Sequence, residues 1–343
     1  MAIDVPLDVQ ILIIEWVFRS SQPASIDYTT LHACALVCRA WTPTAQRLLF
    51  RRISCIFSDD IHFFRLLVST LSIRPHLATH VRYIRVAWPS YPPDYGDVCL
   101  RLLELCRHVE GISFFHRGHN NKPLSAESSA RLRAIQLRPV FLEVLGLPIG
   151  KAVVNMFPGV RFLSFVHGDE HPLPSTLETL KTRMSARQCL SLSESLPVLR
   201  NLCLIIPRWS DKLLCQHFNA AGILPRLRSL EIKGEIPPQG ILEQLTQLET
   251  LVVAVLAGQH ASLPASLRHF GYHPWRDVTP GAHVELALDP LRVLPQLQLV
   301  TVTRGVDQHV RTALEGMCHN KGVEFARYET PLHFQQPQYI DWI

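Results

Sequence analysis

The chain lacks the short patterns that mark most enzymes and metalloproteins. Its nine cysteines include no pair at the two-residue separation that zinc ribbons and redox motifs use. No glycine-rich phosphate loop, Gly-X-Ser-X-Gly elbow or kinase signature occurs. There is no Asn-X-Ser/Thr signal either, so the pattern favours free thiols in a reducing cytoplasm or nucleus. We therefore expect no cofactor, no metal and no catalytic residue.

Concentrated charge and long apolar runs are also missing. The 343 residues are 47% hydrophobic and 18% charged, and the net charge of +5 is spread without a basic block, which gives nucleic-acid binding no specific support. Beyond the first helix, the longest apolar stretch is residues 251–257, far short of a membrane span. The first residues lack the basic and then apolar pattern of a secretory signal. We expect a folded cytoplasmic or nuclear protein with one small and one larger domain and no membrane contact.

One polar cluster resembles a metal site in composition only. Residues 167–171 hold two histidines and two carboxylates, which are possible metal ligands. Gly168 and Pro172 predict a loop, so the histidines lack the helix that would bring both to one face. An enzyme that uses this loop is therefore the least favoured hypothesis.

The first fifty residues predict three short helices. Pro6 suits the first position of a helix, and Asp8 adds favourable negative charge to its first turn. Asp27 is a good N-cap for a second helix, and Thr42 followed by Pro43 marks the start of a third. The first helix is apolar on most of its surface: one face carries Leu7, Ile11, Ile14 and Phe18, and Val9, Leu12, Ile13, Trp16 and Val17 fill much of the remainder.

Helices that are apolar on more than one side need cover from elsewhere, because so small a unit buries little surface alone. The pattern leaves two alternatives open. Either the rest of the chain covers these helices, or a partner protein does.

This segment resembles an F-box, particularly those of mushroom-forming fungi. The resemblance rests on three stretches in the family's order: Val5, Pro6, Leu7 and Asp8 at the start; Leu36, Val37, Cys38, Arg39, Ala40 and Trp41 at the end of the second helix; and Leu48, Leu49, Phe50, Arg51, Arg52 and Ile53 at the end of the third. The sequence departs from the family at Gln10, where an apolar residue is usual, and in its long link from Arg19 to Ile26.

The resemblance implies binding to the Skp adaptor, and through it to a cullin, in an SCF ubiquitin ligase. No chemistry is expected of the helices themselves. The adaptor-contacting candidates carried over from the family are Pro6, Leu7, Leu12, Leu36, Val37, Trp41 and Leu48.

Beyond the helices, a repeat of leucines predicts stacked strands. The template is Leu, two residues, Leu, two residues, Leu, one residue, apolar, and it resembles the strand-forming half of a leucine-rich repeat. Each unit cannot bury its apolar side alone, so neighbours must stack into a solenoid. The clearest copies are Leu196, Leu199, Leu202 and Leu204; Leu224, Leu227, Leu230 and Ile232; Leu245, Leu248, Leu251 and Val253; and, more weakly, Leu294, Leu297, Val300 and Val302.

The predicted fold is therefore α/β: a three-helix F-box followed by an irregular leucine-rich-repeat-like solenoid with parallel strands and helical or irregular crossovers. An ordinary parallel α/β domain has the same alternation and stays the alternative. The expected domains are 1–55 for the F-box, 56–95 for a connecting helix, strand and Pro-rich loop, 96–330 for the repeats and 331–343 for a tail.

Such arrays bind extended protein surfaces. The substrate-contacting candidates that lie in or after the repeated strands are Arg208, Trp209, Lys233, Tyr272, Trp275 and Arg304. The favoured function is a substrate-recognition subunit of an SCF ligase for an unknown target protein. The alternative is a non-catalytic scaffold that binds the Skp adaptor without a role in ubiquitination.

Overall fold

The structure is a computed structural model. It describes residues 6–20, 28–55, 61–89, 94–117, 125–145, 153–154, 156–166, 173–183, 196–204, 222–235, 239–255, 263–273, 291–292, 294–303 and 306–328. The chain divides into two compact units: the described residues up to Gly159 belong to the first, and the second spans Val160–Phe334. This division falls inside the region predicted as one repeat array, and the boundaries predicted at residues 55, 95 and 330 stay predictions.

Three helices open the first unit: α1 (Leu7–Ser20), α2 (Tyr28–Val37) and α3 (Thr42–Arg51). The third begins at Thr42 as predicted, with Pro43 in its first turn, where a missing N–H costs nothing. The Thr42 hydroxyl donates hydrogen bonds to the carbonyls of Ala35 (2.9 Å) and Cys38 (3.1 Å), which joins the start of α3 to the end of α2. The predicted N-cap Asp27 lies outside the described residues.

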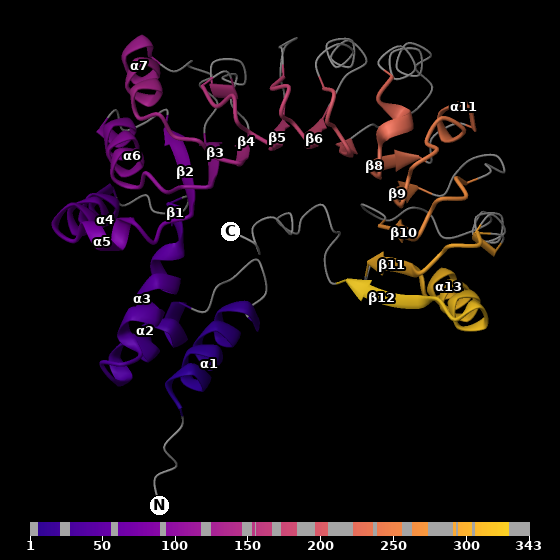
Figure 1. Ribbon diagram of the computed structural model, residues 1–343, viewed down its shortest axis with the longest axis horizontal. Helices are drawn as coiled ribbons and strands as arrows, with labels where there is room; N and C mark the ends of the chain where they lie inside the picture. The colour runs from indigo at the N-terminus through magenta and orange to yellow at the C-terminus, as the bar shows by residue number, and fades with distance from the viewer. Residues whose placement is uncertain are drawn as a thin grey trace, which may run out of the picture. The chain divides into compact units, whose positions relative to one another are not determined.

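A parallel sheet follows the three helices in the first unit. The Tyr28 hydroxyl donates to the carbonyl of Arg52 at 3.1 Å and so connects α2 to the first strand. Figure 1 shows α4, α6 and α7 on the same side of this sheet. In chain order the elements are β1 (Arg52–Cys55), α4 (Ile61–Ile73), α5 (Pro75–Ala78), β2 (Tyr83–Pro89), α6 (Asp94–Leu105), β3 (Gly111–Arg117), α7 (Ala126–Ala134) and β4 (Phe141–Leu145).

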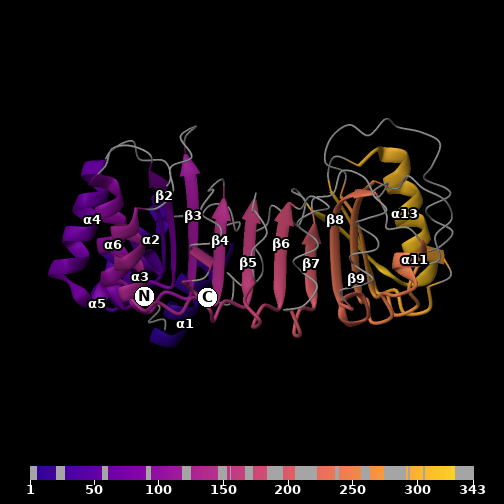
Figure 2. The ribbon, with the colours of Figure 1, turned by 90° about the horizontal axis from the view of Figure 1, so that it is seen from above.

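The second unit is a run of parallel strands in sequence order. Each strand from β6 onward pairs with the strand that precedes it in the chain, and Figure 2 shows β5, β6 and β7 side by side with the same direction. The elements are β5 (Phe162–Val166), β6 (Thr179–Arg183), β7 (Asn201–Leu204), η2 (Leu224–Arg226), β8 (Ser229–Glu235), α11 (Gln239–Leu242), β9 (Thr250–Val255), β10 (His269–Tyr272), β11 (Leu299–Thr303), α13 (Gln308–Lys321) and β12 (Glu324–Tyr328).

The leucine template marks the buried side of the strands of the second unit. In all four clear copies, every template side chain is at most 7% exposed. The third template position of each copy lies in a single row across the paired strands: Leu202, Leu230, Leu251 and Val300, with Phe270 between the last two. The predicted fold class, α/β with parallel strands stacked in a leucine-rich-repeat-like solenoid, is confirmed.

A ladder of shared backbone carbonyls aligns the strands of the second unit. The carbonyl of Arg161 accepts hydrogen bonds from the amides of Glu178 (2.8 Å) and Thr179 (3.0 Å). The same arrangement, with one carbonyl just before a strand and two successive amides of the next repeat, recurs at the carbonyls of Glu178, Arg200, Arg228, Glu249 and Arg268. Because each strand begins at the same point relative to its neighbour, the apolar positions line up without a side chain to specify them.

No helix in the described part of the chain is long and apolar enough to cross a membrane.

Candidate partner-binding surface

The outward face of α1 carries an apolar stripe. Val9, Leu12, Ile13 and Trp16 follow the i, i+3, i+4, i+7 spacing of one helix face, and their exposed fractions are 40%, 62%, 46% and 67%. Helices in soluble proteins normally turn such a face toward the core. Here the core-facing residue is instead Ile14, which is fully buried. We call Val9, Leu12, Ile13 and Trp16 the α1 stripe.

The end of α2 adds two more exposed apolar side chains. Leu36 is 74% exposed and Val37 is 63% exposed, while Leu31 on the opposite side of the same helix is fully buried. At the other end of the segment, Leu7 is 52% exposed and the preceding Pro6 is also exposed. Five of the seven residues predicted to contact a partner, namely Pro6, Leu7, Leu12, Leu36 and Val37, therefore lie at the surface.

The other two lie elsewhere. Leu48 is only 2% exposed and belongs to the core of the three helices, together with Ile14, Leu31 and Ala45. Trp41 is half-buried and packs against that core. Leu48 is thus a structural residue, because α3 is amphipathic and turns this side chain inward. Its helical spacing could not tell the inward face from the outward one.

Polar contacts fix the rotation of α1. The indole Nε1 of Trp41 donates a hydrogen bond to the Gln10 side-chain oxygen. Arg47 of α3 forms an ion pair with Glu15 of α1, at 2.8 Å between Nη2 and Oε1. Both contacts lie on the side of α1 that faces the other helices. Gln10, a polar residue at a position expected to be apolar, therefore has a structural reason for its presence: it satisfies a half-buried indole N–H.

Sequence reasoning missed three members of the α1 stripe. Val9, Ile13 and Trp16 were placed on the helix but not among the contact candidates. Their regular spacing with Leu12 was the available signal. It could not be used because Leu7, Ile11 and Ile14 show an equally regular spacing, and periodicity alone cannot decide which of two apolar faces is buried.

A second candidate surface is a row of polar side chains across the sheet of the second unit. Thr179, Asn201, Ser229, Thr250 and His269 occupy paired positions on β6 to β10. Each is half-buried, and each alternates along its strand with a template residue on the other face. Asn201 donates to the Thr179 hydroxyl at 3.0 Å. We call these five residues the polar row. The position of the polar row follows from the leucine template, because each of its residues directly precedes the residue at the third template position.

Two imidazoles meet one hydroxyl near the end of this row. His269 Nε2 lies 2.9 Å from Thr301 Oγ1, and His273 Nε2 lies 3.2 Å from the same oxygen. His273 and Thr301 are buried. Burial also lowers the pKa of His269. The neutral imidazole is thus the favoured form, and one hydroxyl can donate to one ring and accept from the other.

Of the six predicted substrate-contacting residues, the structure describes two, Lys233 and Tyr272. Tyr272 is only 8% exposed, and burial raises the pKa of its hydroxyl. It is a buried residue rather than a surface contact, because it occupies the fourth template position on the buried face of the sheet. Lys233 lies in β8. Arg208, Trp209, Trp275 and Arg304 lie outside the described residues.

The described part of the chain contains no group of three or more His, Cys, Asp or Glu side chains that could hold a metal ion. The polar cluster at residues 167–171 lies outside it.

The sequence matches no family model and no curated protein. Among solved structures the chain is similar to a chain of the TLR13–ssRNA13 complex, with 14% sequence identity and a TM-score of 0.33 over 67% of this chain. The match covers 41% of that chain, so the present protein spans less than half its length. A likeness this distant carries no argument about function.

Proposed function

We propose that this protein is the substrate-recognition subunit of a Skp–cullin–F-box ubiquitin ligase. In this proposal the three helices α1 to α3 form an F-box that binds the Skp adaptor, and through it a cullin. The strands of the second unit bind the protein to be ubiquitinated. The chain itself performs no chemistry and works in the cytoplasm or nucleus.

The observation that carries the proposal is the α1 stripe together with Leu36 and Val37. These six apolar side chains are 40–74% exposed in a segment whose own core is already formed by Ile14, Leu31, Ala45 and Leu48. Apolar surface of this extent on two helices marks a site of association. The same segment carries the three stretches that resemble an F-box. A protein groove that accepts apolar helix faces fits this surface.

The polar row supports the second half of the proposal. Its side chains are polar and half-buried and occupy paired positions on adjacent strands. Adjacent strands of a sheet lie about 4.8 Å apart, so the row offers hydrogen-bonding groups at regular intervals over an extended target. A small, deep catalytic pocket would need converging groups instead.

Co-expression with a fungal Skp adaptor tests the first half. Wild type should elute with the adaptor as a one-to-one complex in size-exclusion chromatography. The double variant Leu12→Ser with Leu36→Ser should lose the complex, because it places two hydroxyls in a surface that must become dry.

The matched control is Phe63→Ser with Leu66→Ser. These residues lie on α4 and are 62% and 58% exposed, so the control removes a comparable amount of exposed apolar surface outside the three helices. It should keep the complex. Absence of a complex with wild type, or equal loss in both double variants, would overturn the adaptor assignment.

The scaffold alternative differs in what happens to partners. If the chain recruits a substrate, some protein bound by the second unit should accumulate when the chain is deleted. The protein should remain at this raised level when the deletion is complemented with the Leu12→Ser and Leu36→Ser variant. A scaffold without a ubiquitination role would leave every bound partner at an unchanged level.

A further inference from the structure

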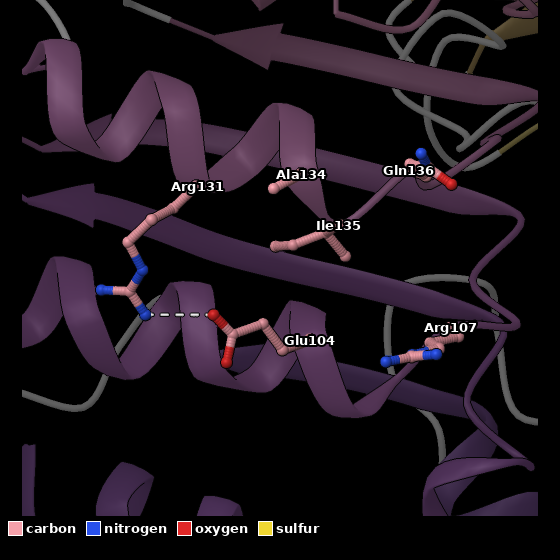
Figure 3. Close-up of a pocket in the computed structure, with 6 residues that line it drawn as sticks. All are labelled: Glu104, Arg107, Arg131, Ala134, Ile135 and Gln136. Atoms are coloured by element: carbon pink, nitrogen blue, oxygen red, sulfur yellow. Dashed lines mark hydrogen bonds and ion pairs between the residues drawn. The ribbon is translucent and has the colours of Figure 1, made fainter.

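A pocket lies at the C-terminal ends of α6 and α7 in the first unit, and none of its lining residues belongs to the two surfaces described above. Its volume is about 280 Å³, close to the lower limit for sites that hold small molecules. Figure 3 shows the ion pair of Glu104 and Arg131 on one side, Arg107 and Gln136 on the other, and Ile135 between them. The lining residues are Glu104, Arg107, Arg131, Ala134, Ile135 and Gln136.

The acidic group of the pocket is already compensated. Arg101 donates to Glu104 Oε2 at 3.0 Å, and Arg131 donates to Glu104 Oε1 at 3.1 Å. Arg131 also pairs with Asp97 at 2.6 Å. Although burial acts to raise it, the hydrogen bonds from Arg101 and Arg131 lower the pKa of Glu104. Both carboxylate oxygens of Glu104 therefore have cationic partners, and neither is left to attract a cation into the pocket.

Arg107 is different, because no described residue forms an ion pair with it. Its guanidinium carries five N–H donors and stays charged at any physiological pH. With Glu104 compensated twice, the charge at the Arg107 side of the pocket is positive. The facing wall, Ala134 and Ile135, is apolar. The pocket thus combines one available cation with an apolar surface for a short carbon chain.

Gln136 completes this side of the pocket at a conformational cost. Its φ is +55°, and it is the described non-glycine residue with a positive φ. It directly follows the C-cap of α7, where glycine is the usual residue because it adopts this conformation without strain. A glutamine here keeps a side-chain amide at the pocket, where it can donate a hydrogen bond.

We propose that this pocket binds one acidic side chain of a partner protein, with the carboxylate or phosphoryl group on Arg107 and the Gln136 amide and the stem against Ala134 and Ile135. The volume of about 280 Å³ accommodates one side chain. Arginine is well suited to either head group because its planar fork binds two oxygens at once. The proposal does not depend on adaptor binding.

Ligand-observed saturation-transfer NMR on the full chain tests it. The probes are N-acetyl-glutamate methylamide, N-acetyl-phosphoserine methylamide and the neutral N-acetyl-glutamine methylamide. The two acidic probes should bind at millimolar concentrations and the neutral probe should not. The stronger of the acidic probes identifies the head group. Inorganic phosphate and acetate serve as competitors, and each should compete more weakly than the capped probe with the same head group.

Two variants assign binding to the pocket. Arg107→Gln should weaken the acidic probes by about tenfold or more, since it removes a charge-assisted hydrogen bond. Arg133→Gln is the matched control: it removes the same charge from an exposed residue of α7 that does not line the pocket, and it should leave binding unchanged.

A third variant separates a binding role from a structural one. Gln136→Gly should weaken the acidic probes and raise the thermal midpoint of the chain, because glycine relieves the backbone at this position. Equal binding of the neutral probe, equal weakening by both arginine variants, or competition by free phosphate or acetate as strong as that of the capped probes would overturn the proposal.

Discussion

The α1 helix and the repeats of the second unit place similar apolar residues in opposite environments. Val9, Leu12, Ile13 and Trp16 are 40–67% exposed, whereas the template leucines of the second unit are at most 7% exposed. Both sets are regular in sequence. The difference is that neighbouring repeats cover each template leucine, while the described residues leave much of the α1 stripe uncovered. Regular spacing therefore predicts which residues share a face and does not predict whether the chain covers that face.

The largest expected effect is a difference in the free energy of unfolding between a substitution in the leucine template and one in the α1 stripe. Leu251→Ala removes a fully buried template side chain and should lower the free energy of unfolding by about 2 to 5 kcal/mol. Leu12→Ala in the α1 stripe should change it by less than about 0.5 kcal/mol. Urea unfolding followed by circular dichroism measures both. A cost for Leu12→Ala as large as that for Leu251→Ala would mean that the stripe is structural.

A smaller loss of stability is expected at Gly271, where side chains of the two neighbouring strands approach the backbone closely. A Cβ added at Gly271 would lie 2.9 Å from Val252 Cγ2 and 3.0 Å from Thr301 Oγ1. Since these side chains sit on the neighbouring strands β9 and β11, Gly271→Ala should cost about 1 to 3 kcal/mol by overpacking. The same change at Gly240, which has open space around it, should be neutral or slightly stabilising in the same unfolding experiment.

The half-buried His269 should make the second unit sensitive to acid. The pKa of His269 is lower in the folded chain than in the unfolded chain, so the unfolded chain binds a proton first as the pH falls. Stability should therefore decline below a pH of about 6.5. His269→Gln should flatten this decline between pH 7 and pH 5. An unchanged slope in the variant would show that other groups cause it.

The smallest change in stability is expected from a surface ion pair of the second unit. Arg161 makes a bidentate contact with Glu178, with both hydrogen bonds at 2.8 Å, but its side chain is 51% exposed. Arg161→Ala should cost about 1 kcal/mol or less, and the cost should shrink at high salt. A salt-independent loss would indicate that the arginine stem packs against the repeat instead.

Much of the fold could be predicted from the sequence because the same leucine template recurs, and each copy supports the assignment of the others. The fourfold recurrence of the leucine template located β7, β8, β9 and β11, and the partial copy at Leu267 and Phe270 located β10. The outcome for the candidate sites was weaker. Leu48 and Tyr272 were expected on contact surfaces and are buried. The spacing of apolar residues in a helix or strand does not show which of its faces is exposed to solvent.

The pocket between α6 and α7 had no sequence signal at all. Arg107 and Gln136 are brought together by the ends of two helices that are separated in sequence by β3. The strained backbone of Gln136 is likewise invisible in the sequence, because glutamine has no preference for a left-handed conformation.

The shared carbonyls of the second unit give each pair of neighbouring strands the same backbone connection. Each carbonyl, from Arg161 to Arg268, accepts hydrogen bonds from two backbone amides of the next repeat, so the register between neighbouring strands does not depend on a polar side chain. The segments between strands can then differ in length, as they do from Thr179 to Asn201 and from His269 to Leu299, while the sheet keeps its register. A lineage could therefore lengthen, shorten or exchange whole repeats without changing the pairing of the strands.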